Sequence, residues 1–404
     1  MANTLKFGNS EWYGTEGNIL AYNDENGNFK PLPFDFSRGS SATRVNQQGL
    51  IETVGANDAR VDYLDNANGA LLLEPSRTNL ITYSQDFSQW NSYITTPSLN
   101  SATSPSGDVN SAKLTSTGVF GNLNLNISKS SSSLEYTQSV FVKAVNYSIV
   151  NLISYGSSSA NRAQVSFNLS NGSVSSSATV NGNYSNPSES IKDYGNGWYR
   201  ISLSFTSDTS VEVRPHIQFP IQMTNDNYVL IYGAQLEQGS YPTSIINTQG
   251  TVQTRLADSC SQTVSSNIIT QAEGTLYWSG HLNNLTNYSN LISLSGGGGS
   301  WVYILSYSGG LTFEIKSNYS TSLSFNPSGY AEGSHKIAIS YSGSEAVIYI
   351  NGILAHTDNS VVIPSFSVLN IGEWSGYGQS KETKEVKLYN TRLSNSELAA
   401  LTQV

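Results

Sequence analysis

Residues 136–143 read YTQSVFVK and residues 198–205 read WYRISLSF, and both stretches alternate between two kinds of side chain. Successive side chains of a β-strand point to opposite faces of a sheet, so a period of two predicts strands with distinct faces. On the first stretch, one face is expected to carry Tyr136, Gln138, Val140 and Val142. On the second, the inward face is expected to carry Tyr199, Ile201, Leu203 and Phe205.

The composition of the whole chain agrees with these two strands. Of the 404 residues, 12% are charged, 38% hydrophobic and 11% aromatic, whereas roughly 25% charged residues are usual in globular domains. Ser, Asn and Gly are abundant and disfavour helix interiors, while Tyr, Val, Ile and Thr favour strands. Disorder requires low hydrophobicity with high net charge, and a formal charge of -9 over this length does not meet that condition. The sequence therefore predicts an all-β protein.

The strand signals divide the chain into three parts. Residues 1–80 are dense in turns and short strands, which predicts a small N-terminal arm or attachment module leaning on a neighbour. Residues 81–258 show strands at intervals of about 8 to 12 residues, the spacing of a β-sandwich. Residues 259–404 continue this pattern in a second sandwich. We therefore expect two tandem antiparallel β-sandwiches after a short N-terminal segment.

Two local signals refine the last part. Asn351 and Gly352 follow an alternating run, which is a strong hairpin signal. Ser394 and Glu397 have the spacing of a capping box, which predicts a short C-terminal helix. Gly296 to Gly299 are expected at a hairpin tip, since no helix with a basic residue follows them to bind a phosphate.

Charge and cysteine content exclude several classes of partner and site. A net charge of -9 argues against nucleic acid and anionic membranes, which bind clustered Lys and Arg. The single cysteine, Cys260, excludes an internal disulfide and a cysteine-based zinc cluster. Residues 1–10 lack the apolar core of a secretory signal, so we expect synthesis in a cytoplasm without export.

Five short phrases carry a family resemblance. They are FSRGSSATRV at 36–45, GLIE at 49–52, LLEPSRTNL at 72–80, GNGWYR at 195–200 and GAQLEQG at 233–239. The first three resemble a leader of tailed-bacteriophage virion proteins, in which it precedes a carbohydrate-binding-like jelly roll. The last two resemble the closing phrases of that jelly roll. The resemblance implies a particle protein whose N-terminal segment docks to other virion proteins.

The C-terminal part carries a second resemblance. GTL at 274–276, KIAI at 336–339, YING at 349–352 and LS at 393–394 are similar to phrases of laminin-G or concanavalin-like sandwiches. Such sandwiches serve as lectins, adhesins, hydrolase scaffolds and spacers, so the resemblance implies a fold more firmly than a function.

Catalytic chemistry has little support in the sequence. The four histidines lie far apart, and His335 beside Lys336 is expected to be a solvated edge residue. No nucleophile, base and orienting group occur together, so we expect no enzyme activity, no cofactor and no metal site, although a calcium ion in either sandwich stays open. One acid, Glu373, has aromatic company and would be the catalytic residue of a polysaccharide depolymerase.

Sugar binding needs only an aromatic face and a few hydrogen-bonding groups. Trp301 follows a glycine run, and Trp374 and Tyr377 lie among glycines. These three residues are the glycan-contact candidates, with packing against a neighbouring chain as the alternative role.

Taken together, these observations favour a non-enzymatic structural protein at the virion surface, synthesised in the host cytoplasm. It would be a head fibre, tail fibre, appendage or capsid-decoration subunit that attaches to host-surface glycans and inserts into no membrane. Two alternatives stay open, a virion-associated polysaccharide depolymerase and a bacterial lectin-like adhesin. Few charges and many Tyr and Ser residues would suit burial in a homotrimer, but no heptads occur, so a monomer stays open as well.

Overall fold

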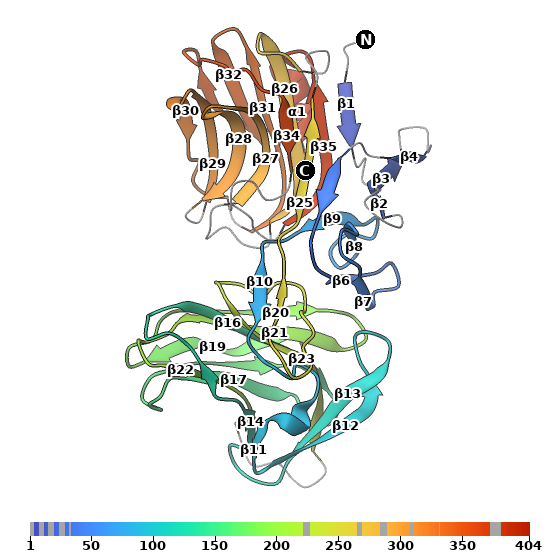
Figure 1. Cartoon of the computed structure of the whole chain (residues 1–404), viewed down its shortest axis with the longest axis vertical. Helices are drawn as coiled ribbons and strands as arrows, with labels where there is room; N and C mark the ends of the chain where they lie inside the picture. The colour runs from blue at the N-terminus through green and yellow to red at the C-terminus, as the bar shows by residue number, and fades with distance from the viewer. Residues whose placement is uncertain are drawn as a thin grey trace. The chain divides into compact units, whose positions relative to one another are not determined.

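A computed structural model describes residues 34–220, 227–264, 269–282, 289–307, 310–330, 332–371 and 381–404. Before residue 34 it describes the backbone of four strands, namely β1 (Thr4–Phe7), β2 (Trp12–Gly14), β3 (Leu20–Asn23) and β4 (Phe29–Pro31). Antiparallel β-strands dominate the described chain, which has one α-helix and one short 3-10 helix, η1 (Phe87–Gln89) (Figure 1). The predicted all-β class is confirmed.

Two compact units make up the chain. The central unit comprises Gln48–Glu52 and Arg77–Arg255. The terminal unit comprises Met1–Gln47, Thr53–Ser76 and Leu256–Val404. Each unit contains two antiparallel sheets that enclose a core, so the prediction of two sandwiches is confirmed.

The central unit is the first sandwich. One sheet has the order β11 (Asn91–Tyr93), β14 (Asn122–Asn124), β22 (Glu212–Gln218), β17 (Ile149–Tyr155), β18 (Arg162–Asn168) and β19 (Ser173–Asn181), with β15 (Ile127–Ser128) beside β22. The other has the order β12 (Thr95–Thr103), β13 (Val109–Ser116), β23 (Tyr228–Gln238), β16 (Glu135–Ala144), β21 (Trp198–Thr206) and β20 (Ser185–Asp193). A short ribbon pairs β10 (Arg77–Asn79) with β24 (Gln253–Arg255).

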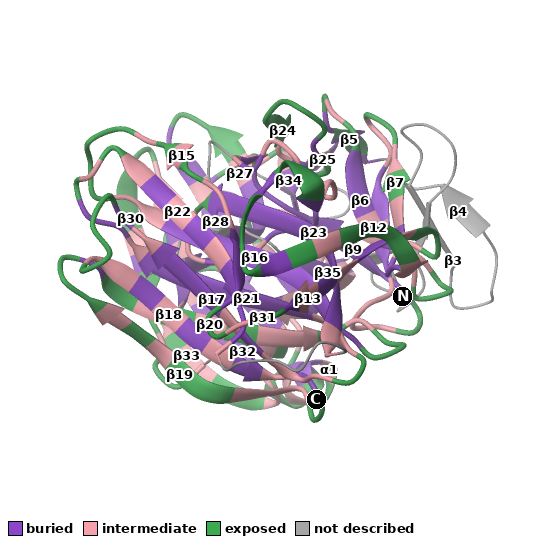
Figure 2. Ribbon diagram, turned by 90° about the horizontal axis from the view of Figure 1, so that it is seen from below, coloured by how far each residue is buried: buried purple, intermediate pink, exposed green. Residues whose placement is uncertain are grey.

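The core of the central unit follows the alternation of its strands. Val140 on β16 and Leu203 on β21 are fully buried, and they share one core with Leu152 and Val165 of the other sheet. Ile201 and Phe205 belong to the same core, and Tyr199 packs against it half-buried, which confirms the inward face predicted for this strand. Buried and partly exposed residues alternate as stripes along β18 and β22 (Figure 2).

The terminal unit is the second sandwich. One sheet has the order β33 (Ile353–Asp358), β32 (Glu345–Ile350), β31 (Gly333–Ser342), β26 (Glu273–Leu282), β35 (Lys381–Tyr389), β9 (Ala70–Leu73) and β8 (Arg60–Asp62), with β1 beside β35. The other has the order β30 (Ser320–Phe325), β29 (Gly310–Ser317), β28 (Ser300–Tyr307), β27 (Ser289–Gly297), β34 (Val368–Asn370), β25 (Ser259–Thr263) and β5 (Asp35–Ser37). The remaining strands of the N-terminal part are β6 (Ala42–Val45) and β7 (Ile51–Val54).

Three local predictions for the terminal unit can be checked directly. Asn351 and Gly352 form the two-residue turn between β32 and β33, both with positive φ, as a type I′ hairpin requires. Ser394 caps the helix α1 (Asn395–Thr402) in a complete capping box with Glu397. Both predictions are confirmed. His335, expected to be solvated, is instead 7% exposed, because β31 lies between β26 and β32 rather than at an edge.

Several N-terminal strands join the sheets of the terminal unit. β5 pairs with β25, and β9 pairs with β35, so residues before 77 extend both sheets of the terminal unit. The expected division into 1–80, 81–258 and 259–404 therefore differs from the grouping of contacts over the first 80 residues. Short strands that could not form a core alone gain one by completing the edges of a larger sheet.

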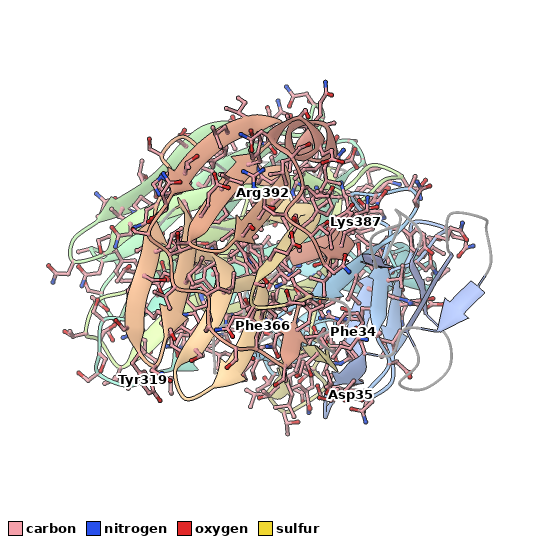
Figure 3. The ribbon with its side chains drawn as sticks, turned by 90° about the horizontal axis from the view of Figure 1, so that it is seen from above. Phe34, Asp35, Tyr319, Phe366, Lys387 and Arg392 are labelled. Carbon is pink, nitrogen blue, oxygen red and sulfur yellow. The ribbon has the colours of Figure 1, made fainter. Side chains whose placement is uncertain are left out.

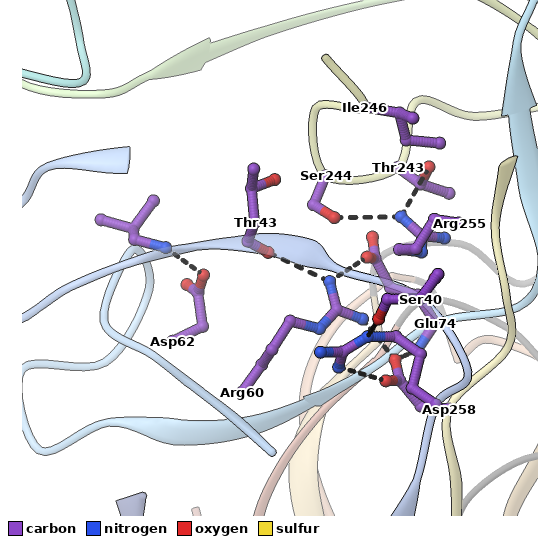
Figure 4. A network of polar contacts seen from close by, with 12 residues as sticks. Ser40, Thr43, Arg60, Asp62, Glu74, Thr243, Ser244, Ile246, Arg255 and Asp258 are labelled. Atoms are coloured by element: carbon purple, nitrogen blue, oxygen red, sulfur yellow. Dashed lines mark hydrogen bonds and ion pairs between the residues drawn. The ribbon is translucent and has the colours of Figure 1, made fainter. Parts of the chain in front are cut away.

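Arg38 and Glu74 of the leader phrases join Arg60 and Asp258 in a buried ion cluster of the terminal unit (Figure 4). Asp258 accepts a hydrogen bond from Arg38 Nη1 at 3.0 Å, pairs with Arg60 Nη2, and accepts the backbone N–H of Glu74 at 2.8 Å. Arg60 Nη1 also donates to Glu74 at 2.6 Å. Buried charges are tolerated only when paired and hydrogen-bonded. The leader residues thus have a structural role, which ties strands β5, β8 and β9 to the start of the C-terminal strands.

Candidate functional site

Two hairpin tips lie together at one end of the second sheet of the terminal unit. Gly298 and Gly299 turn the chain from β27 to β28, and Asn318 and Tyr319 turn it from β29 to β30. The backbone N–H of Tyr319 donates to the carbonyl oxygen of Gly299 at 2.9 Å, and that of Asn318 donates to Ser300 Oγ at 3.1 Å. These two bonds hold the tips in a defined relative position, and they confirm a hairpin tip at the glycine run.

Tyr319 occupies a conformation that is costly for its residue type. Its φ is +63°, in the left-handed region that turns of this kind reserve for Gly or Asn. Its side chain is 77% exposed, and it is labelled at the margin of the molecule in Figure 3. A Cβ atom on Gly299 would lie 2.5 Å from the Tyr319 ring, so only glycine leaves room for the ring there. A strained, exposed aromatic residue points to a functional position.

Aromatic side chains continue from this tip along the outer face of β28. Trp301 and Tyr303 lie two residues apart on the same face, and their rings stack at 5.5 Å with an interplanar angle of 13°. The Tyr319 ring meets Trp301 edge-on, at 6.5 Å and 88°. Trp301 is half-buried and Tyr303 is buried, so Tyr319 offers the most accessible ring. The exposure of the three rings thus increases from Tyr303 through Trp301 to Tyr319 at the hairpin tip.

Two opposite charges on the neighbouring strand β29 complete this surface. Lys316 and Glu314 face Trp301 and Tyr303 in the register of β28 and β29. Lys316 Nζ lies 5.2 Å from the centroid of the Trp301 ring and 2.9 Å from Glu314 Oε2. The Tyr303 hydroxyl donates to the same carboxylate oxygen. We name Trp301, Tyr303, Glu314, Lys316 and Tyr319 the aromatic tip. Its charges balance, so it presents ring faces and polar groups without net charge.

The three glycan-contact candidates from the sequence have different outcomes. Trp301 lies in the aromatic tip, although its ring is partly covered by its neighbours. Trp374 and Tyr377 lie outside the described residues, as does Glu373. Tyr319 was missed, because periodicity does not separate an exposed turn tyrosine from a strand tyrosine. Its position between the alternating runs of β29 and β30 was the available signal.

The central unit presents a second polar surface that the sequence analysis also missed. Carboxamide side chains gather on the outer face of one sheet. Asn122 and Asn151 lie opposite Gln218 on the two strands that pair with β22, and Asn124 lies opposite His216. Asn151 Oδ1 and His216 Nδ1 are buried and have no hydrogen-bond partner in the described part of the chain. Burial, helped by Arg214, lowers the pKa of His216 to about 4, so its ring is neutral near pH 7. A buried polar atom without a hydrogen-bond partner costs free energy, so these two atoms mark a point where the polar groups of this sheet are incompletely satisfied.

Cys260 and Lys381 lie inside the terminal unit rather than at a surface. Cys260 is 1% exposed, and burial raises the pKa of its thiol well above the ordinary value. Lys381 is 2% exposed, and its ammonium donates to the carbonyl oxygens of Asn290 and Leu291. Burial lowers the pKa of Lys381 to about 7. Thiol reactivity requires an accessible thiolate, and the Cys260 thiol is buried and protonated.

The described residues offer neither a metal-binding cluster nor a membrane-spanning helix. In those ranges, no three His, Cys, Asp or Glu side chains lie close enough to bind a metal ion together. No helix there is long and apolar enough to cross a membrane.

Comparison with known proteins gives structural likeness only. No family model and no curated protein matches the chain. The chain is similar to the CBM40 of a Ruminococcus gnavus IT-sialidase bound to α2,3 sialyllactose, with 17% identity and a TM-score of 0.30 over 33% of this chain and 84% of that one. It is also similar to the binding domain of botulinum neurotoxin serotype D, with 16% identity and a TM-score of 0.31 over 35% of this chain and 40% of that one. Both are binding domains, but likeness at this level carries no conclusion about the ligand of this chain.

Proposed function

We propose that this chain is a non-enzymatic structural protein of a bacteriophage particle that attaches to host-surface glycans through the aromatic tip. It would stand at the virion surface as a fibre, appendage or decoration subunit, with its N-terminal segment docked to other virion proteins. The exposed and strained Tyr319 beside Trp301 carries the glycan-binding part of this proposal. The resemblance of the leader phrases to those of virion proteins supports the part of the proposal that concerns the phage particle.

The chemistry of the aromatic tip supports a saccharide as ligand. Sugar rings present C–H groups that pack on aromatic faces, and they present hydroxyl groups that pair with nearby polar side chains. Tyr319 supplies the accessible face, while the Glu314 carboxylate and the Lys316 ammonium lie one strand away. Because these two charges pair with each other, the tip favours uncharged sugar units. Binding should therefore depend only weakly on salt concentration.

A glycan array probed with the full chain tests this role. Tyr319→Gly removes the ring and also relieves the positive φ, so the variant should fold at least as stably as the wild type. We expect it to lose at least tenfold in affinity for any glycan that the wild type binds. Tyr319→Phe keeps the ring and serves as the matched control, with affinity within about threefold of the wild type.

Two results would contradict the glycan proposal. One is equal binding by wild type and Tyr319→Gly, since the ring would then contribute nothing. The other is release of new reducing ends from host envelope polysaccharide by the wild type and not by Glu373→Gln, which would instead establish a depolymerase.

The virion role has its own test. Immunogold labelling and mass spectrometry of purified particles should find the chain on the particle surface. Its absence from particles of a phage that encodes it would contradict the virion proposal and leave the glycan result intact, as expected of an adhesin.

A further inference from the structure

Four large apolar side chains stand exposed at one end of the central unit. Tyr93 and Ile94 lie at the crossover from β11 to β12, and Val119 and Phe120 lie in the turn between β13 and β14 (Figure 1). Their exposed fractions are 56%, 39%, 42% and 56% in that order. We name these four residues the edge patch, because β11 and β12 are edge strands of their sheets. Exposed apolar groups that gather in this way mark interaction surfaces.

The edge patch is held rigid in an unfavourable backbone conformation. Ile94 has φ +53° and Phe120 has φ +58°, and such values are outliers for branched and bulky residues. The Ile94 carbonyl oxygen accepts the Thr117 N–H and the Ser116 hydroxyl, each at 3.1 Å. The Phe120 carbonyl oxygen accepts from Asn122 Nδ2 at 3.0 Å. These bonds fix the backbone that carries the exposed side chains before any partner arrives, which lowers the part of the entropy cost of binding that comes from ordering the loop.

The segment that carries the edge patch has few charged residues. Residues 91–128 contain two charged side chains, Asp108 and Lys113, whose charges cancel. Lys113 Nζ is engaged over the Tyr228 ring at 4.2 Å. The chain as a whole has a net charge of -9, so two copies repel each other through most of their surfaces. The segment 91–128 adds nothing to that net charge, so a second copy meets less repulsion at the edge patch than a uniformly acidic surface would give.

The exposed area suits a contact between two copies. Four large side chains that are about half exposed present roughly 400 Å² of surface per copy, since a large aromatic or aliphatic side chain can bury about 200 Å². A standard interface buries about 800 Å² per partner, of which somewhat more than half is apolar. Asn91 is exposed and Asn124 is partly exposed on the adjoining strands β11 and β14, and both add polar area to this surface.

We propose that the edge patch is the surface through which two copies of this chain associate. The contact is made by side chains rather than by extension of a sheet. Pro97 on β12 has no N–H to donate, and the pairing of β12 with β13 shifts register between Ser98 and Ala102. Both features block continuous strand addition at this edge, whereas they leave the four apolar side chains free to interlock.

Sedimentation equilibrium of the full chain tests the proposal. We expect a mass of at least twice 43.6 kDa at concentrations of about 1 to 100 µM. Ile94→Asn combined with Phe120→Asn should raise the dissociation constant at least tenfold. Asn tolerates positive φ, so this variant should also melt no lower than the wild type, which separates lost association from lost folding. Val211→Asn, which removes another apolar side chain of the central unit that is 62% exposed, is the matched control and should associate normally.

Two results overturn the proposal: a single-chain mass throughout this concentration range, or an association that the double substitution leaves unchanged. Neither result bears on glycan binding by the aromatic tip, which is measured separately with Tyr319→Gly.

Discussion

Replacing Asp258 by alanine should destabilise the terminal unit strongly and the central unit hardly at all. The Asp258 carboxylate is fully buried and accepts from Arg38, from Arg60 and from the Glu74 backbone. Its removal leaves two buried guanidinium groups with one carboxylate fewer, and breaking a buried ion pair from one side costs about 3 to 5 kcal/mol. We take this range as the expected loss in free energy of unfolding of the terminal unit.

Native-state hydrogen exchange gives the assay, because it reports each unit separately. Slowly exchanging amides of β26 and β31 should lose about 3 to 5 kcal/mol of protection, while those of β16 and β21 should change by less than about 0.5 kcal/mol. Asp358→Ala is the control, since that carboxylate only accepts from Ser360 in a surface turn and should cost about 1 kcal/mol or less. The reasoning would be refuted if Asp258→Ala lowered the protection of the β26 amides by less than about 1 kcal/mol, or if the amides of both units lost equal protection.

Two further predictions concern the terminal unit. Burial lowers the pKa of Lys381 to about 7 against an ordinary 10.5, so between these values the unfolded chain binds more protons and stability rises with pH. Urea unfolding of the wild type and of Lys381→Met at several pH values measures this effect. Relative to Lys381→Met, the free energy of unfolding of the wild type should rise by about 2 kcal/mol from pH 7 to pH 9. The same pH dependence in both proteins would contradict the prediction. Ser394→Ala removes the acceptor of the Glu397 N–H and should lower the stability of α1 by about 1 kcal/mol, measured by exchange of its amides. Ser396→Ala, within the same first turn, should change it by less than half as much.

Local sequence signals predicted local structure well. The alternation around Val140 and Leu203 placed both side chains in the core of the central unit. The Asn351–Gly352 turn and the capping box at Ser394 also formed as expected. Each of these features depends on residues within a few positions of one another, so backbone geometry alone determines them.

Contacts between distant segments could not be predicted in this way. Nothing in the local pattern indicates that Phe36 pairs with Cys260, or that Arg60 meets Asp258 in a buried cluster. The leader phrases were visible in the sequence, but their structural role was not. A strand of three residues carries no information about which sheet edge it completes, because that choice depends on the core it covers.

The binding surfaces show the same division. The sequence by itself determined that the chain is all-β, that its surface carries few charges, and that Trp301 follows a glycine turn. Only the tertiary structure decided that the strained Tyr319 lies against that turn, with Lys316 and Glu314 beside it. The physical reason is that strand alternation specifies which face a side chain takes, whereas strand order and register specify its neighbours. Those depend on long-range packing of the whole sandwich.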